Sequence, residues 1–418
     1  MKLKTSLLLF LILIQHPIIG QQLSPVVVGQ SHTLTSEILQ SERNLLISLP
    51  DDYQPNEKYP VLYVLDGKKW FLEAVSKRQI LRSYDYVPPF IVVGVPTDDQ
   101  PRYGFFNNAE RLQNHLEQEV IPYIENQYSS SPKRMVAGWQ FASAFLIQTL
   151  AQKPTLFDAW FAASPFPIQG NRLNLLKTSL ENGSLTSGTL VFATSLNENS
   201  VEGGAQELAA LLEAEAPENL RWHYAKLKNE ATVSAGHRTT PMGTLYQGLR
   251  TYFEDYPVLE FNTHAQYKAL GGFDYVERYY QQRSSAYGFS SEIPEEGMFF
   301  LIRMCMDANE VSDFHFFMQK FKDTDFFANN NLGWNMRFAA VYMENEQYEN
   351  ALKQFETIAS LFSESPRPIY GMAKAYEALG QKENALKHYE RTVSLATAAN
   401  DRNLKQYQDD LDTFKKGM

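Results

Sequence analysis

The sequence predicts an α/β domain, in which helices cover both faces of a mostly parallel sheet, followed by an all-α domain. Continuous apolar runs alternate with helical patterns between residues 44 and 253, and the strand signals stop after about Pro257. A segment near the C-terminus repeats at a spacing of 34 residues. Residues 133–144 read as a strand, a sharp turn and the start of a helix. Apolar runs without polar alternation suit strands of a covered parallel sheet.

The individual elements follow from these runs and from their boundaries. Strands are predicted at 44–48, 60–65, 90–95, 134–137, 159–163, 189–194 and 222–226. Helices are predicted at 110–127, 141–152, 205–214 and 240–253. For the last helix, Thr240 is the expected N-cap and Pro241 the expected first residue. Strands that alternate with helices in this way indicate a doubly wound α/β sheet.

Length and composition limit the classes of function. A chain of 418 residues suggests two to three domains. With 38 basic and 48 acidic residues, neither nucleic acid nor an anionic membrane is expected as the main partner. Cys305 is the only cysteine, so an intrachain disulfide and a CxxC metal site are impossible. The HExxH motif is absent and the eight histidines form no evident ligand cluster, so no metal or cofactor is expected.

The N-terminus reads as a secretion signal. Lys2 and Lys4 precede an apolar run at residues 7–14, and a cleavage position follows Gly20. The run is too short to span a bilayer well. Residues 1–20 are therefore expected to be a cleaved signal peptide, which predicts a secreted or periplasmic protein without a stable membrane anchor. An uncleaved signal anchor is the alternative.

The turn after the strand at 134–137 has the character of a nucleophile elbow, whose pattern is G-x-S-x-G. Gly138 and Ala142 supply the small residues, but Gln140 stands at the centre. A carboxamide nitrogen is conjugated to its carbonyl and is a poor nucleophile. Because loss of a catalytic serine costs roughly a million-fold in turnover, the sequence predicts the scaffold of a serine hydrolase without its serine.

The remaining groups of such a site can be assigned by chain order. In hydrolases with a nucleophile elbow the order is nucleophile, acid, histidine. His237 is the candidate base and Glu198 the candidate acid. The oxyanion donors would be the backbone N–H groups of Phe141 and of the loop near Gly67. The alternatives are a surface histidine beside a helix N-terminus and a solvated loop glutamate.

The C-terminal repeat aligns residues 347–356 with 381–390, which share seven identities in ten. A 34-residue period with alanine and aromatic positions is the tetratricopeptide signature. A degenerate third pair is expected between Met298 and Phe321, and the repeats are expected to pack against the preceding domain or further helices. The alternative is two similar amphipathic helices that arose by chance. The positions expected to be buried are Tyr342, Ala351, Phe355, Tyr376, Ala385 and Tyr389.

Several segments between residues 27 and 256 resemble the esterase D / enterochelin-esterase family of α/β-hydrolases. They are Ser36–Leu39 with Arg43, LPDDY at 49–53, YPVLYVLDG at 59–67, IPYIE at 121–125, AASP at 162–165 and the stretch from Gly236-His237 to Leu249. The resemblance implies the α/β-hydrolase doubly wound sheet of a serine ester hydrolase, with His237 at the base position. Some members of the family also carry a signal peptide and C-terminal helical repeats.

The chain also departs from the family pattern. The family's elbow usually reads G-H-S-x-G-G, whereas residues 138–143 here read GWQFAS. An R-D-x-x-P string that usually precedes the helix at 110 is replaced by PRYGFF at 101–106. Ser143 lies inside the predicted helix and should point away from the oxyanion hole, while Ser164 better suits the cap of a strand end.

The expected domains are a hydrolase-like domain at 21–256, a helical linker with a degenerate repeat at 257–330, two repeats at 331–398 and a C-terminal helix at 399–418. The favoured hypothesis is a catalytically impaired hydrolase that binds a small ester-like ligand, with a protein partner on the repeats. One alternative is an active carboxylic ester hydrolase that uses another nucleophile or an activated water near His237. Another is that the repeats carry the function and the hydrolase domain is a scaffold.

Overall fold

The computed structural model describes residues 25–97, 106, 108–196, 198–228 and 232–418. The predicted signal peptide lies outside these ranges. So do residues 101–105 of the segment PRYGFF, which departs from the family pattern. The chain divides into two compact units. The first comprises Met1–Tyr53, Val61–Lys77 and Phe90–Tyr246, and the second comprises Gln54–Pro60, Arg78–Pro89 and Gln247–Met418.

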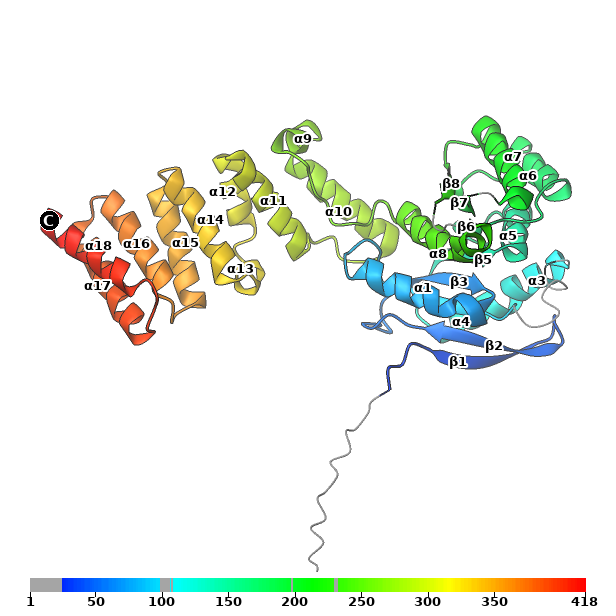
Figure 1. The fold of residues 1–418 in the computed structure, drawn as a ribbon, viewed down its shortest axis with the longest axis horizontal. Helices are drawn as coiled ribbons and strands as arrows, with labels where there is room; N and C mark the ends of the chain where they lie inside the picture. Colours follow the sequence, from blue (N-terminus) through cyan, green and yellow to red (C-terminus); the bar gives the residue numbers. More distant parts are fainter. Residues whose placement is uncertain (1–24, 98–105, 107, 197, 229–231) are drawn as a thin grey trace, which may run out of the picture. The chain divides into compact units, whose positions relative to one another are not determined.

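The first unit contains an eight-stranded sheet in the order β1-β2-β4-β3-β5-β6-β7-β8 (Figure 1). Strands β1 and β2 pair antiparallel, as do β2 and β4, whereas β3 and β4 are parallel and β5 to β8 form a parallel set. The bounds are β1 Gln30–Ser36, β2 Ser41–Ser48, β3 Tyr59–Leu65, β4 Ile91–Val95, β5 Ser130–Trp139, β6 Ala159–Ala163, β7 Gly188–Ser195 and β8 Leu220–Leu227. All seven predicted strands are confirmed.

Burial explains which strands the pattern revealed. Every residue of β3, β4 and β6 is buried, as expected for strands covered on both faces. Strand β1 was missed because its sequence, QSHTLTS, contains a single aliphatic residue. It lies at the edge of the sheet, where most of its residues stay exposed or half-buried.

Helices cover both faces of the sheet, as predicted for a doubly wound α/β sheet. Helices α3, α5, α6 and α7 pack in succession, and α5 and α7 contact strands of the parallel set. A cavity lined by Leu65, Ala137 and Phe161 also has walls from α1 and α8, which places these two helices beside β3, β5 and β6. The bounds are α1 Gly67–Arg82, α3 Ala109–His115, a π-helical turn Leu116–Val120, α4 Ile121–Gln127, α5 Phe141–Gln152, α6 Asn171–Glu181, α7 Asn199–Glu215 and α8 Val233–Tyr252.

The predicted start of the last helix of this unit was wrong. Helix α8 begins at Val233, so Thr240 is not its N-cap and Pro241 lies in its interior. The Thr240 hydroxyl donates to the Gly236 carbonyl at 2.8 Å, which is a bond back along the helix. The Thr-Pro pair resembles a helix start because both residue types are favoured there. Here the helix has already begun seven residues before Thr240, at Val233.

Residues 258–418 of the second unit form helices joined by turns, without a strand. The bounds are α9 His264–Ala269, α10 Phe273–Tyr287, α11 Glu295–Ala308, α12 Val311–Lys320, α13 Phe326–Asn329, α14 Leu332–Glu344, α15 Tyr348–Leu361, α16 Pro366–Ala378, α17 Lys382–Ala398 and α18 Leu404–Gly417. From α14 to α18 each helix packs on the next (Figure 1). Among the helices of the described ranges, none is long and apolar enough to cross a membrane.

The repeat positions lie between these stacked helices. Five of the six named residues are buried, namely Tyr342, Ala351, Phe355, Ala385 and Tyr389, and Tyr376 is half-buried. The predicted degenerate pair corresponds to the adjacent helices α11 and α12. The burial predictions are therefore confirmed except for the partial exposure of Tyr376, while the tetratricopeptide assignment stays a prediction.

Candidate active site

Gln140 occupies the sharp turn between β5 and α5. Its backbone has φ 55° and ψ −116°, a region that costs a non-glycine residue roughly 1–3 kcal/mol. The turn is held by bonds from Gln140 N–H to the Ala163 carbonyl at 3.0 Å and from Ala144 N–H to the Gln140 carbonyl at 2.9 Å. A Cβ at Gly138 would lie 2.9 Å from the Ala142 Cβ. Helix α5 thus passes close to strand β5. This close approach requires small residues such as Gly138 and Ala142, which identified the elbow in the sequence.

The side chain of Gln140 contacts the imidazole of His237. The carboxamide lies against His237 Nε2, and the other ring nitrogen, Nδ1, lies against the carboxylate of Glu198. The tautomer that fits both contacts is protonated on Nδ1, so that His237 donates to Glu198 and accepts an amide N–H from Gln140. The structure thus brings the predicted base, the predicted acid and the nucleophile position together in one chain of contacts.

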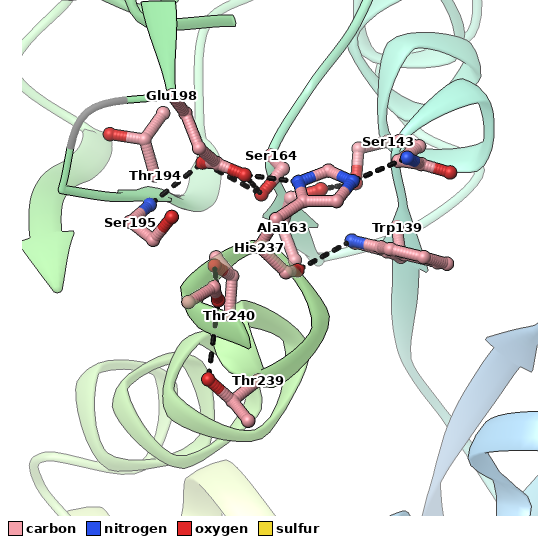
Figure 2. A network of polar contacts seen from close by, with 12 residues as sticks. Trp139, Ser143, Ala163, Ser164, Thr194, Ser195, Glu198, His237, Thr239 and Thr240 are labelled. Atoms are coloured by element: carbon pink, nitrogen blue, oxygen red, sulfur yellow. Dashed lines mark hydrogen bonds and ion pairs between the residues drawn. The ribbon is translucent and has the colours of Figure 1, made fainter. Parts of the chain in front are cut away.

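Glu198 is held by several donors (Figure 2). Its side chain is buried, with 3% of the residue exposed. Besides His237, the Ser195 N–H donates to it at 2.7 Å, and the Ser164 hydroxyl lies 2.9 and 3.0 Å from its two oxygens. Burial acts to raise the pKa of Glu198, but the bonds from His237, Ser195 and Ser164 outweigh it and hold that pKa below its usual value. The carboxylate is therefore ionised at neutral pH and can orient a histidine.

The sheet explains why these groups meet. Gln140 follows β5, Ser164 follows β6 and Glu198 follows β7. Strands β5, β6 and β7 are parallel neighbours, so their carboxyl ends lie along one edge, where ligands bind in open α/β sheets. His237 reaches the same edge from the first turns of α8. The parallel strands therefore bring together the three positions that were predicted from chain order, with Gln140 at the nucleophile position.

The predicted oxyanion residues each begin a helix. Phe141 is the first residue of α5 and Gly67 the first residue of α1. The N-terminus of a helix carries a partial positive charge, which favours a developing negative charge. A Cβ at Gly67 would lie 2.5 Å from the Gly94 carbonyl carbon, so glycine is required for the close approach of α1 to β4. The oxyanion role of both residues stays a prediction.

The two serines near the elbow bind other protein groups. Ser143 is fully buried, and its hydroxyl lies 2.6 Å from the Gly138 carbonyl and 2.8 Å from the Ala163 carbonyl. Ser164 is also fully buried and donates to Glu198. Its position directly after β6 was anticipated, but its bond to the acid was not. The AASP string of the family resemblance was the signal that could have indicated it.

A further Ser-His-Glu cluster lies elsewhere in the first unit but lacks the geometry of a relay. His115 Nδ1 lies 3.2 Å from the Ser36 hydroxyl and 2.5 Å from Glu119 Oε2. The same carboxylate oxygen accepts the Ser36 hydroxyl at 2.5 Å. A catalytic histidine uses different nitrogens for the nucleophile and the acid. This cluster therefore fastens β1 to helix α3 and the adjoining π-helical turn.

Trp139, the residue before Gln140, also contacts the candidate base. Its indole N–H donates to the His237 carbonyl at 3.1 Å (Figure 2). The centroids of the indole and imidazole rings are 5.0 Å apart. Sequence reasoning missed this contact. Within the described ranges, no group of three or more His, Cys, Asp or Glu side chains is placed to hold a metal ion.

Comparisons with known proteins agree with the fold of the first unit. Residues 36–224 match the family model Esterase, described as "Putative esterase". Two curated relatives come from Bacillus subtilis (strain 168). The uncharacterized protein YjcH is 27% identical over 157 residues, which are 33% of this chain and 61% of YjcH. The ferri-bacillibactin esterase BesA is 25% identical over 230 residues, which are 46% of this chain and 79% of BesA.

A solved structure supports the fold. The IroE-like serine hydrolase from Shewanella oneidensis superposes with a TM-score of 0.53 at 23% identity, covering 70% of this chain and 98% of that one. The chain covers less than two thirds of the length of YjcH. Residues 36–224 therefore resemble the esterase family, and the first unit has an α/β-hydrolase fold.

Proposed function

We propose that this protein is a catalytically impaired member of the esterase family that acts as a binding module. The observation that carries the proposal is the contact between the Gln140 carboxamide and His237 Nε2. In a serine hydrolase this nitrogen removes the proton of the nucleophile. A carboxamide offers neither an ionisable proton at neutral pH nor a nucleophilic lone pair, so the acyl intermediate has no atom on which to form.

The neighbouring hydroxyls do not replace the missing serine. Ser143 and Ser164 are fully buried, and their hydroxyls bind backbone carbonyls and Glu198 respectively. A nucleophile must face both a base and the substrate. Neither hydroxyl is bonded to His237, so the geometry supports loss of covalent catalysis.

The ligand we propose is a small ester-like molecule bound at the carboxyl edge of the sheet. The Glu198–His237 pair remains intact, and the turn that carries Gln140 keeps its strained backbone. One relative is named a ferri-bacillibactin esterase, which makes a siderophore ester the first ligand class to test. A fold that no longer cleaves a ligand can still bind it, because function resides in the site rather than in the fold.

The helical unit and the N-terminus extend the proposal. We propose that helices α14–α17 are tetratricopeptide-like repeats that bind a protein partner, and that residues 1–20 are removed on secretion. Deletion of residues 258–418 tests whether partner binding requires the helices. Mass spectrometry of the mature protein tests the signal, since cleavage after Gly20 predicts Gln21 as the first residue.

A second candidate function is hydrolysis by a water molecule. The observation that favours it is the Glu198–His237 contact, because an oriented imidazole is a general base when its Nε2 is accessible. In this case Gln140 would position the water instead of blocking the base. Turnover would then require His237 and would proceed without any covalent adduct.

The deciding experiment combines a small activated acetyl ester with a covalent serine probe, followed by mass spectrometry. The impaired-hydrolase proposal predicts negligible turnover and no labelled residue. Turnover that disappears in His237→Ala, still without a label, would favour the water mechanism. A labelled serine would overturn both candidates. Calorimetric titration with a non-hydrolysable ester analogue measures ligand binding separately.

A further inference from the structure

Pro241 lies inside helix α8 and creates a local gap in its hydrogen bonding. In an α-helix, the N–H of a residue donates to the carbonyl four positions earlier. Proline has no N–H, and its ring also crowds that carbonyl. The carbonyl four positions before Pro241 belongs to His237, the candidate base. This carbonyl therefore lacks the regular helical bond that an N–H at position 241 would donate.

Trp139 supplies the missing donor. Its indole Nε1–H donates to the His237 carbonyl at 3.1 Å, the position that the residue-241 N–H would serve in an unbroken helix. Trp139 and Pro241 also line the same small cavity, which places the indole beside the proline. The bond joins Trp139, the last residue of β5, to His237 of helix α8, a residue 98 positions later in the chain.

The indole is itself held in place. Only 9% of Trp139 is exposed. The ring of Trp70 packs edge-on against it at a centroid distance of 5.8 Å, and Lys69 Nζ lies 4.1 Å from its ring centroid. The imidazole of His237 packs on the same indole at 5.0 Å. Both the backbone and the ring of His237 therefore rest on one fixed side chain.

We propose that Trp139 is a positioning residue for His237, and that its indole N–H takes the place of the backbone N–H that Pro241 lacks. The strand that carries the elbow thereby sets the orientation of the base directly, without using the residue at position 140. The inference does not depend on whether the site cleaves an ester, because it concerns the imidazole in the protein as it exists.

The proposal predicts that Trp139 and Pro241 compensate for each other. Trp139→Phe keeps an aromatic ring but removes the donor. Pro241→Ala restores a backbone N–H at position 241, which can donate to the His237 carbonyl. The double variant should therefore regain what Trp139→Phe loses, which a purely structural role of the indole in packing would not predict.

The first readout is the imidazole of His237 in the ¹⁵N-labelled full chain, measured by two-bond nitrogen–proton correlation NMR. In the wild-type protein we expect one dominant tautomer with the proton on Nδ1, as the Glu198 contact requires. Trp139→Phe should move both ring nitrogen shifts towards averaged values, and the double variant should return them. Unchanged shifts in Trp139→Phe, or averaged shifts that persist in the double variant, would overturn the proposal.

The second readout does not require a Trp139 variant to fold. In Pro241→Ala the backbone N–H competes for the His237 carbonyl, so the Trp139 indole N–H should shift upfield. Its exchange with solvent should become about fivefold faster, since a net hydrogen bond is worth about 1 kcal/mol. An indole resonance that keeps its wild-type position and exchange rate would show that the two donors do not share this acceptor.

Discussion

The imidazole of His237 presents its Nε2 atom to the carboxamide of Gln140, on the side where a hydrolase holds its nucleophile. The opposite nitrogen keeps its contact with Glu198, which is itself bound by Ser195 and Ser164. His237 and Glu198, the predicted base and acid, are therefore in contact beside Gln140. Under the proposed function, the absence of a serine at position 140 is a specific and reversible defect, which leads to the first prediction.

Gln140→Ser should restore weak hydrolysis of a small activated ester. A serine hydroxyl at this turn would face His237 Nε2, and a positioned general base contributes roughly 10²- to 10⁴-fold. Rescue should be incomplete because Ala142 stands where the family pattern has glycine, in a turn so close that a Cβ at Gly138 would lie 2.9 Å from the Ala142 Cβ. Steady-state rates measured for Gln140→Ser, with and without Ala142→Gly, test both steps.

Two matched variants control this experiment. Gln140→Ala removes the carboxamide without adding a nucleophile and should remain inactive. His237→Ala in the Gln140→Ser background should remove the regained rate. A regained rate that survives the loss of His237 would mean that another group acts as the base.

The buried carboxylate of Glu198 should make stability depend on pH. Burial opposes its ionisation, but the donors around it hold the folded-state pKa below the usual value. The stabilisation is therefore complete above the unfolded-state pKa of about 4.3 and is lost as the pH falls through the folded-state pKa. Glu198→Gln should lower the free energy of unfolding by about 2 kcal/mol at pH 7, the worth of hydrogen bonds to a charged group.

Urea unfolding of the wild-type protein and Glu198→Gln at pH 7 and at pH 3 measures this effect. Tryptophan fluorescence is a suitable probe, because Trp70, Trp139, Trp160 and Trp222 belong to the first unit. The difference between the two proteins should shrink at the acid end. A difference that stays the same at both pH values would contradict the assigned ionisation.

The sequence was most informative where one physical signal dominated. Strands such as β3 are buried along their whole length and appear as continuous apolar runs. The contact between Glu198 and His237 could be anticipated because both follow from chain order in a parallel sheet. The 34-residue spacing likewise located residues such as Phe355 that the helical unit buries.

The features that the sequence analysis did not predict depend on contacts between segments that are far apart in the chain or on neighbouring residues. Strand β1 is stabilised by pairing with β2 at the sheet edge, which its own polar sequence does not reveal. Helix α8 continues upstream of Pro241, although a Thr-Pro pair normally indicates a helix start. The indole of Trp139 bonds a carbonyl 98 residues away, and only the folded chain brings them together.

Gly67→Ala should destabilise the first unit. The new Cβ would lie 2.5 Å from the Gly94 carbonyl carbon and 2.6 Å from the Val95 nitrogen. These are backbone atoms of β4, which cannot move aside by changing a rotamer, so a cost of about 3 kcal/mol is expected for overpacking. The change in the urea midpoint of tryptophan fluorescence measures it.

Gly203→Ala is the matched control for Gly67→Ala. Gly203 is exposed on helix α7, and a Cβ there would meet only Gln169 Nε2 at 3.8 Å. Alanine in a helix interior is favoured over glycine by roughly 0.5–1 kcal/mol, so this variant should be slightly more stable. Equal effects of the two substitutions would show that the close approach of α1 to β4 is not limiting.

Gly371→Ala should loosen the packing between α15 and α16 in the helical unit. A Cβ at this position would lie 2.5 Å from the Phe355 ring carbon Cζ, and Phe355 is 3% exposed and cannot swing into solvent. The clash should cost about 1–3 kcal/mol, despite the better helix propensity of alanine. Adding Phe355→Leu should relieve it, so that the double variant is more stable than the sum of the two single effects requires. Hydrogen exchange of α15 and α16 measures all three variants, and strictly additive effects would mean that residues 371 and 355 do not meet across these helices.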